Sequence, residues 1–502
     1  MQLAPAGRPP ADGVAGGVAF PAGADGRRSA SATARAAFAA AAGAVSPEAA
    51  AAVGAEPDWR HAYPAHVLRL VELGLAHGGS CPAMAAAGLD ALHARVEFLR
   101  EGRAAPLREA MADAVRTRFW SVTVAGSGAG VSRLEVPYRG SLLAGDGLRR
   151  QASRWVEAGI AEPSFAEAIG EVIDHPEWLD LSDRHIAVLG AGAELGPFSV
   201  LTRWRANLAA VDLPDPALWR RILALAEAGN AHVTIPLREP AAGATLEVAV
   251  QAGANLLTDT PEIAAWLADL PGPLCVGCHA YLDGEAHVRV ALAMDAIVEA
   301  LLQRRRDIVP AWLLTPTDVY AVPEPTARIA MRRWGGRGGL RLAQEALRAA
   351  SGGRLFVPNV TAILDGSGGM QAGIADGLVL QQGPNYALAK RLQQWRALAA
   401  RAQGIPVSAR VAPATRTRSV VKNRALAAAY RGAHHFGVEV FEPETANALM
   451  AALLVRDLRS ADPGPPTHPL QPFMDCALHG GLWTLPWLPR SALPVAALLG
   501  LF

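Results

Sequence analysis

The amino-acid sequence predicts an α/β fold: a doubly wound parallel sheet, preceded by a mainly helical N-terminal domain and interrupted by a central insertion. Two observations lead to this prediction. From Asp183 onward, short apolar strands alternate strictly with helices, which is the pattern of parallel strands joined by helical crossovers. In addition, the first of these strands leads into a glycine-rich turn and the second ends in an acid, as in dinucleotide-binding units.

The composition limits the classes of function. The chain has 502 residues, of which 51% are hydrophobic, so a main domain with large additions can bury a core. A formal net charge of +1 gives no overall attraction to nucleic acid or membranes, and no apolar run is long enough to span a bilayer. Four cysteines are too few for a disulfide framework and predict a reducing compartment, the cytoplasm or an organelle. We therefore expect a small-molecule substrate and leave a homo-oligomer open.

Changes in composition divide the chain into four parts. Residues 1–55 are rich in Ala, Gly and Pro and poor in acids, which is typical of a disordered tail and also of an organelle transit segment. Residues 56–180 are mostly helical, with a strand near 119–124, and carry no catalytic motif. Residues 181–460 hold the alternating pattern, with an insertion at about 324–382. Residues 461–502 complete the sheet or dock on it.

The glycine-rich turn is the first candidate binding element. The strand at 185–189 leads into Gly190, Gly192 and Gly196, where the lack of side chains lets backbone N–H groups approach a pyrophosphate at the start of the next helix. Asp212, at the end of the second strand, can accept hydrogen bonds from the adenosine ribose and would repel the 2′-phosphate of NADP. The expected cofactor is therefore NAD, with NADP as the alternative. A glycine-rich turn in an α/β protein that binds no nucleotide remains the plain alternative.

The later elements continue the alternation. In such a sheet, ligands bind at the carboxyl ends of the strands, so polar residues at those ends are candidates for the active site. Further strands are expected at 207–211, 233–237, 274–277 and 311–315, and helices at 197–205, 261–270 and 286–304.

A helix with a Tyr and a Lys one turn apart is the candidate catalytic element. Pro384 suits the first turn, Gly404 ends the helix, and a strand is expected at 407–411. Tyr386 and Lys390 stand four residues apart, so both lie on one face. A nearby ammonium favours the phenolate and lowers the pKa of the phenol, which can then exchange a proton with a carbonyl or an alcohol. The alternative is an ordinary amphipathic helix with a boundary Tyr and a Lys that reaches solvent.

The order of these motifs resembles the short-chain dehydrogenase/reductase family. The resemblance rests on Tyr386-x-x-x-Lys390, Gly-Ile-Pro-Val at 404–407, the next strand, and Ala-Pro-x-Thr-x-Thr at 412–417. Gly190 and Gly196 also match the family's glycine motif. The resemblance implies an NAD(P)-binding Rossmann fold with Tyr386 as acid/base and Lys390 as the nicotinamide-ribose ligand that tunes it. It also implies that one segment holds the nicotinamide: Pro413, Thr415 and Thr417.

The sequence departs from the family pattern at several positions. Glu194 replaces the middle glycine of the turn, Ala414 replaces the glycine of Pro-Gly, and residues 278–281 replace an Asn-Asn-Ala-Gly signature. For the family's catalytic Ser, we prefer Thr315 or Thr317 over two residues nearer to Tyr386. Those two alternatives are Thr361 and Ser367.

If Thr315 or Thr317 takes the place of the family's catalytic Ser, residues 324–382 form an insertion between that position and the helix of Tyr386. Both ends of this insertion then lie beside the active site. We expect it to cover the substrate pocket, with a plain decoration as the alternative. The His434-His435 pair is more typical of a loop than of a ligand site, with the expectation that it lines this pocket as the alternative. A zinc site is a weaker alternative for this region, built on Cys275 and Cys278. Residues three apart on a strand face opposite sides of the sheet, and this disfavours binding of one metal ion by both cysteines.

These observations predict an NAD(P)-dependent oxidoreductase that transfers hydride between nicotinamide and a carbonyl or alcohol, with Tyr386 as acid/base. Two other functions stay open on the same fold. One is a dinucleotide-binding scaffold or sensor without turnover, which Glu194 and the missing Asn-Asn-Ala-Gly favour. The other is a dehydratase or epimerase.

Overall fold

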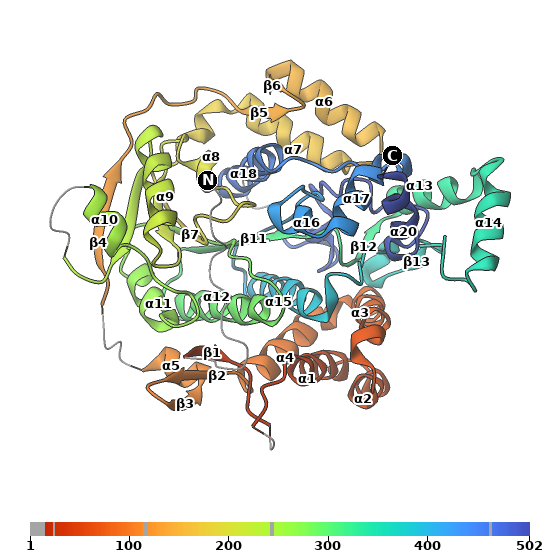
Figure 1. The fold of residues 1–502 in the computed structure, drawn as a ribbon, viewed down its shortest axis with the longest axis horizontal. Helices are drawn as coiled ribbons and strands as arrows, with labels where there is room; N and C mark the ends of the chain where they lie inside the picture. Colours follow the sequence, from red (N-terminus) through yellow and green to blue (C-terminus); the bar gives the residue numbers. More distant parts are fainter. Residues whose placement is uncertain (1–15, 24–25, 114–117, 241–244, 461–463, 502) are drawn as a thin grey trace.

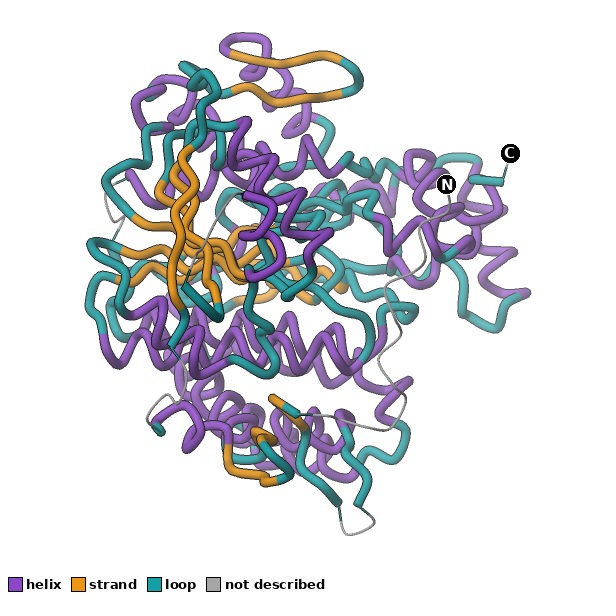
Figure 2. The backbone as a smooth tube through the Cα atoms, turned by 60° about the vertical axis from the view of Figure 1, so that its left-hand side comes forward, coloured by secondary structure: helices purple, strands orange, loops and turns teal. Residues whose placement is uncertain are grey.

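The computed structural model describes residues 16–23, 26–113, 118–240, 245–460 and 464–501. Its centre is a seven-stranded, mostly parallel sheet with helices on both faces, a mixed α/β fold (Figures 1 and 2). The strand order is β15-β11-β10-β7-β8-β9-β4. The strands are β7 (His185–Leu189), β8 (Asn207–Val211), β9 (His232–Leu237), β10 (Leu274–Cys278), β11 (Ile308–Leu314), β15 (Ser408–Val411) and β4 (Trp120–Ala125).

The strand order reverses at β7. The chain proceeds from β7 through β8 to β9 in one direction, then returns to pair β10 with the other edge of β7 and continues to β11 and β15. These six strands are parallel, and β4 pairs antiparallel with β9 at the edge. In open α/β sheets, the crevice outside the carboxyl ends at such a reversal is where ligands bind. The topology therefore places the candidate site at the ends of β7 and β10.

Alternate residues of the central strands bury two different faces. Ala187 and Leu189 belong to one core, and Ile186 and Val188 to the other, because successive strand side chains point to opposite sides. The first core is covered by α11 (Thr260–Ala268), α12 (Glu285–Arg304) and α15 (Gly383–Ala402). The second is covered by α9 (Pro216–Ala228) and α18 (Pro443–Arg459). Burial on both faces explains why these strands read as continuous apolar runs.

The N-terminal part differs from the prediction of a disordered or transit-like segment over residues 1–55. Residues 1–15 lie outside the described residues, but from Gly17 the chain forms β1 (Gly17–Ala19), α1 (Ala30–Gly43) and α2 (Pro47–Ala55). The side chains of Phe20 and Phe38 are at most 2% exposed. Alanine-rich helices resemble low-complexity sequence, yet their small side chains allow close packing of helix on helix.

Residues 56–180 also differ from the prediction, because they do not form one separate helical domain. Helices α3 (Trp59–Ala76) and α4 (Cys81–His93) join α1 in a layer against the outer face of α15 (Figure 1). The chain after α4 forms β2 (Glu97–Arg100) and β3 (Arg103–Pro106) within this part predicted as mostly helical, and then α5 (Leu107–Ala112). It then adds β4 to the far edge of the main sheet. The remainder packs near α18 on the opposite side: β5 (Glu135–Tyr138), β6 (Ser141–Ala144), α6 (Gly145–Glu157) and α7 (Pro163–Asp174).

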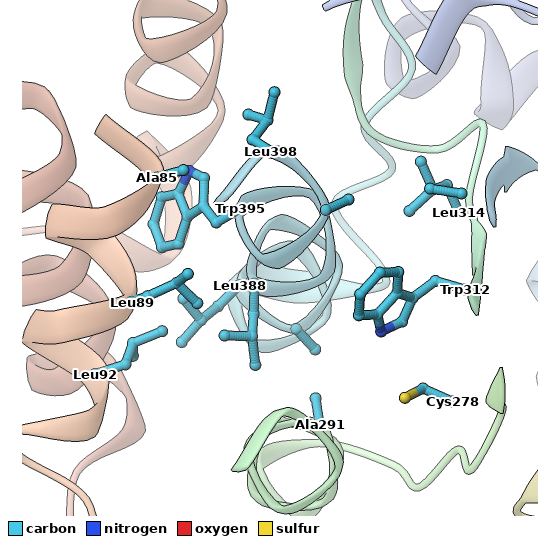
Figure 3. Close-up of a cluster of buried hydrophobic side chains, with 14 of the residues drawn as sticks. Ala85, Leu89, Leu92, Cys278, Ala291, Trp312, Leu314, Leu388, Trp395 and Leu398 are labelled. Carbon is cyan, nitrogen blue, oxygen red and sulfur yellow. The ribbon is translucent and has the colours of Figure 1, made fainter. Parts of the chain in front are cut away.

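The contact between α4 and α15 is close. Leu89 and Leu92 of α4 face Leu388 and Trp395 of α15 (Figure 3). Gly88 is required here, because a Cβ at this position would lie 2.7 Å from the Trp395 ring. The N-terminal layer therefore shares a core with α15.

The central insertion forms a small sheet beside the main one. Strand β12 (Val319–Pro323) pairs with β14 (Gln371–Asp376), which pairs with β13 (Leu364–Asp365). Between them lie α13 (Glu324–Gly335) and α14 (Leu340–Ala350). The described C-terminal residues add helices instead of a strand: α19 (Gln471–Met474) and α20 (Pro489–Leu499). Across the described ranges, no helix combines the length and the apolar character that a bilayer crossing requires.

Candidate functional site

A cavity of about 850 Å³ lies at the carboxyl ends of the parallel strands. Its walls come from the turn after β7, the segments after β10 and β11, the start of α15 and the loop after β15. The predicted residues that line it are Gly192, Thr315, Thr317, Tyr386, Lys390, Pro413, Thr415 and Thr417. Residues that are up to 225 positions apart in the sequence therefore meet in one site, as the strand order requires.

Tyr386 is held at the end of β11 by two hydroxyls. Its phenol lies near the side chains of Thr315 and Thr317, which favour its ionised form, and those two hydroxyls lie 2.8 Å apart. The adjacent Asp318 fixes this loop to α15, because its carboxylate accepts from Arg391 at 2.7 Å and from Gln394 at 2.8 Å. The two threonines are thus placed against the phenol by a buried polar network.

The predicted lowering of the Tyr386 pKa is wrong. Burial raises the pKa of this phenol above its ordinary value, although the hydrogen bonds from the two threonines oppose the rise. The Lys390 ammonium donates instead to the carbonyl of Leu313 at 3.1 Å and to Gln393 at 3.3 Å, and lies 5.8 Å from the Tyr386 ring centroid. Burial lowers the pKa of Lys390 itself to about 8. The phenol is therefore protonated at neutral pH, as a proton donor must be.

The glycine turn is ordered by its own hydrogen bonds. Asp212 accepts from the backbone N–H of Gly192 at 2.7 Å and from that of Leu213 at 2.8 Å. The N–H of Gly196 donates to Asn447 at 2.9 Å. Gly190 has a φ of +94°, and a Cβ there would lie 2.6 Å from the backbone of Ala280, so only glycine fits.

Three predicted cofactor residues are not in the cavity wall: Gly190, Gly196 and Asp212. Gly190 allows the close approach of the turn to Ala280, Gly196 donates its N–H to Asn447, and Asp212 accepts from the turn at Gly192. The helix after the turn is also shorter than expected, since α8 spans only Phe198–Leu201. Of the glycine motif, the structure therefore places only Gly192 directly at the cavity.

Glu194, the residue that replaces the family's middle glycine, points toward the other wall. Its carboxylate accepts from the backbone N–H of Arg418 at 2.8 Å and lies 3.8 Å from the Arg418 guanidinium. Arg418 begins α16 (Arg418–Lys422), so this contact connects the glycine turn to the segment after β15. The Glu194 carboxylate is therefore paired with Arg418, so its charge is partly balanced.

The cavity is covered by α16 and α17 (Arg424–Gly432), which the sequence did not indicate as a lid. Val420, Asn423, Leu426 and Tyr430 of this segment line it. The predicted cover, the insertion at 324–382, contributes only its last two residues, and α13 and α14 take no part in the wall. His434 and His435 are exposed outside the cavity, which contradicts the expectation that they line it. Ser31 and Arg60 of the N-terminal layer also reach the wall.

Three aromatic residues of the cavity were not predicted by the sequence analysis. His279 and His287 are 8% and 2% exposed, and both ring nitrogens of each are buried with no hydrogen-bond partner. Burial lowers the pKa of both imidazoles to about 3, so both are neutral. Tyr281 lies between the lid and the ring of His287. No local sequence pattern identifies these three residues, because the cavity that they line is built from elements far apart in the chain.

The described residues hold no group of three or more His, Cys, Asp or Glu side chains arranged for a metal ion. Cys275, Cys278 and Cys476 are buried thiols.

The sequence matches no protein-family model and no curated protein. Among solved structures, the chain is similar to one described as "Structure of A1-type ketoreductase", with a TM-score of 0.32 and 15% sequence identity. The match covers 64% of this chain and 54% of that chain, so the chain spans about half the length of that structure.

Proposed function

We propose that this protein is an NAD(P)-dependent oxidoreductase of the short-chain dehydrogenase/reductase type, acting on a carbonyl or alcohol substrate. One observation carries the proposal: Tyr386 lines a cavity at the carboxyl ends of parallel strands together with Thr315 and Thr317, with Lys390 one helical turn away. The strand order, which is that of a doubly wound dinucleotide-binding sheet, supports it.

The residues present can carry the proton part of the reaction. Tyr386 is protonated at neutral pH and can donate its proton to the oxygen of a carbonyl as that oxygen gains negative charge. The hydroxyls of Thr315 and Thr317 can hold the same oxygen, because they already contact the phenol. In the reverse direction the phenol must first lose its proton, which its burial makes less favourable. The geometry therefore favours reduction of a carbonyl.

The wall of the cavity fits a dinucleotide. Gly192 lines the cavity, and a Cβ there would lie 2.4 Å from the side chain of Leu218, so only glycine fits at this point of the wall. Pro413, Thr415 and Thr417 also line the cavity, as does Lys390. Bound nicotinamide would supply the hydride. Lys390 would hold its ribose, and the loop from Pro413 to Thr417 would hold its carboxamide end.

A second function, a dinucleotide-binding scaffold or sensor without turnover, is favoured by the glycine turn. The N–H groups of Gly192 and Gly196 are already bonded to Asp212 and Asn447, and Glu194 places a carboxylate at the mouth. A pyrophosphate would have to compete for these groups.

The cofactor proposal is tested by thermal unfolding with NAD, NADH, NADP and NADPH. We expect NAD(H) to stabilise the protein by about 2.7 kcal/mol at a concentration of 100 times Kd. Exchanging Asp212 for Asn and Leu213 for Arg keeps a side-chain oxygen for the N–H of Gly192 and should shift the preference toward NADP(H), because the negative charge beside the turn is replaced by a positive one. Stabilisation of the unmodified protein by NADP(H) alone would show that Asp212 does not select the cofactor.

The pH dependence of cofactor binding tests Lys390. Its pKa of about 8 lies below the ordinary value near 10.4, so the ammonium is present below pH 8 and is lost as the pH rises through 8. We expect the affinity for NADH to fall above pH 8, by up to about tenfold per pH unit if the charge is essential. Lys390→Arg keeps its charge at all these pH values and should remove the decline. An identical decline in Lys390→Arg would assign it to another group.

A further inference from the structure

His287 has the properties of a ligand-binding residue that nothing in the chain satisfies. It lies in the first turn of α12, lines the cavity and is only 2% exposed. Neither of its ring nitrogens has a hydrogen-bond partner. Buried polar atoms in folded proteins are nearly always paired, and an unpaired one is costly. Two such atoms at a cavity wall point to a group that enters from the cavity.

The chemistry of the ring limits what that group is. A neutral imidazole offers one N–H donor and one nitrogen acceptor. A carbonyl can accept from the N–H, and a hydroxyl can pair with either nitrogen. An uncharged oxygen therefore suits this ring without needing a balancing charge.

The position of the ring limits where that oxygen lies in the substrate. The His287 ring is stacked on the Tyr386 ring, with centroids 5.7 Å apart and planes at 23°. A molecule that reacts at the Tyr386 hydroxyl therefore extends past His287. The ring of Tyr281 follows, 4.5 Å from His287, and Tyr430 lies in the lid, so much of the wall is aromatic. Such a wall suits a flat ring.

We propose that His287 determines substrate specificity by binding a second, uncharged oxygen on the substrate, and that the substrates are aromatic carbonyl compounds bearing a ring hydroxyl. The proposal rests on the proposed function for the role of the carbonyl at Tyr386. Tyr386 and its threonines bind the reacting oxygen, and His287 binds the hydroxyl on the far side of the substrate ring. No covalent step involves His287.

Equilibrium binding tests this without a cofactor or any turnover. The probes are 3′-hydroxyacetophenone and acetophenone, which differ by one hydroxyl, titrated calorimetrically into the full chain. We expect the hydroxylated probe to bind about tenfold more tightly, since one hydrogen bond to a buried partner is at stake. In His287→Phe, which keeps a flat ring against Tyr386 but has no nitrogens, the two affinities should become equal. His287→Gln restores a donor and an acceptor and should recover part of the difference.

His435→Phe removes an imidazole outside the cavity and should keep the wild-type ratio. Thermal unfolding of each variant checks that it is folded, and His287→Gln carries the test if His287→Phe is not. Equal affinities in the wild type, no binding of either probe, or a ratio that survives in His287→Phe would each overturn the proposal. Failure to oxidise NADH with any carbonyl would remove the proposed function, while a ratio that depends on His287 would still establish the binding site.

Discussion

Tyr386→Phe is expected to lower turnover by about 10²–10⁴-fold, which is the usual contribution of a positioned proton donor. The substitution removes one hydroxyl and keeps the ring, so the packing against His287 is preserved. Dinucleotide binding should stay nearly unchanged, because the phenol holds the substrate oxygen and Lys390 holds the ribose. The measurements are kcat with NADH and a carbonyl substrate, and the Kd of NADH from fluorescence titration.

The matched control is Tyr63→Phe. Tyr63 is a buried tyrosine of α3, outside the cavity, and burial raises the pKa of its phenol to about 12. Its loss of a hydroxyl should leave kcat close to the wild-type value. Turnover that survives in Tyr386→Phe would contradict the assignment of the proton donor. A wild-type protein that binds NADH but reduces no carbonyl would favour the scaffold.

Asp295→Asn is expected to destabilise the protein by about 3–5 kcal/mol, the usual cost of removing one partner from a buried ion pair. Asp295 of α12 is 4% exposed, and its two oxygens accept from Arg396 of α15 at 2.7 Å each. One of them also lies 2.6 Å from His93 of α4. The amide would leave the buried Arg396 charge with only Glu299, 3.4 Å away, to balance it where three helices meet. Chemical denaturation measures the loss.

The same pair predicts an acid limit to stability. Burial raises the pKa of Asp295, but Arg396 and His93 outweigh it and hold the pKa below the usual range. A carboxyl with a depressed pKa contributes stability above its unfolded pKa near 3.9 and loses it as the pH falls through the folded value. In Asp295→Asn this part of the pH dependence should be absent.

The exposed pair of Arg69 and Glu72 is the control for the buried one. Their side chains are 55% and 37% exposed, so Glu72→Gln should cost at most about 1 kcal/mol. An Asp295→Asn protein as stable as Glu72→Gln would show that the buried network contributes little.

The α/β layers were predictable because each strand or helix shows its type in the periodicity of its own apolar residues. The strands of the main sheet and helices α11, α12 and α15 follow from apolar periodicity, and most boundaries lie within a few residues of those expected, whereas α9 was not predicted. In the N-terminal layer, α3 and α4 lie in the part predicted as mostly helical, but α1 was not predicted, because alanine-rich helices of this kind have almost no amphipathic signal. Their positions depend on contacts with α15, more than 300 residues away.

The candidate site shows the same division. Tyr386 and Lys390 are neighbours on one helix, so their spacing alone places them together. The raised pKa of Tyr386 depends on burial by the lid and on threonines after another strand, which the sequence does not reveal. Asp212 and Gly196 were expected to face a cofactor, since the motif gives their place in the chain but not their hydrogen-bond partners. His287 escaped notice because it belongs to no motif.

The shared core between α4 and α15 has a consequence for dissecting the chain. The sequence pattern changes near residue 180, which invites the construction of a shorter protein that starts there and carries all the predicted catalytic residues. Such a fragment would uncover Trp395 and Leu388 and would leave Arg396 and Asp295 without their covering helices. In such a fragment, the face of α15 that now packs against α4 would be exposed to water. The boundary visible in the sequence is thus not a boundary of the unit that folds, and the two regions must be inherited and expressed together.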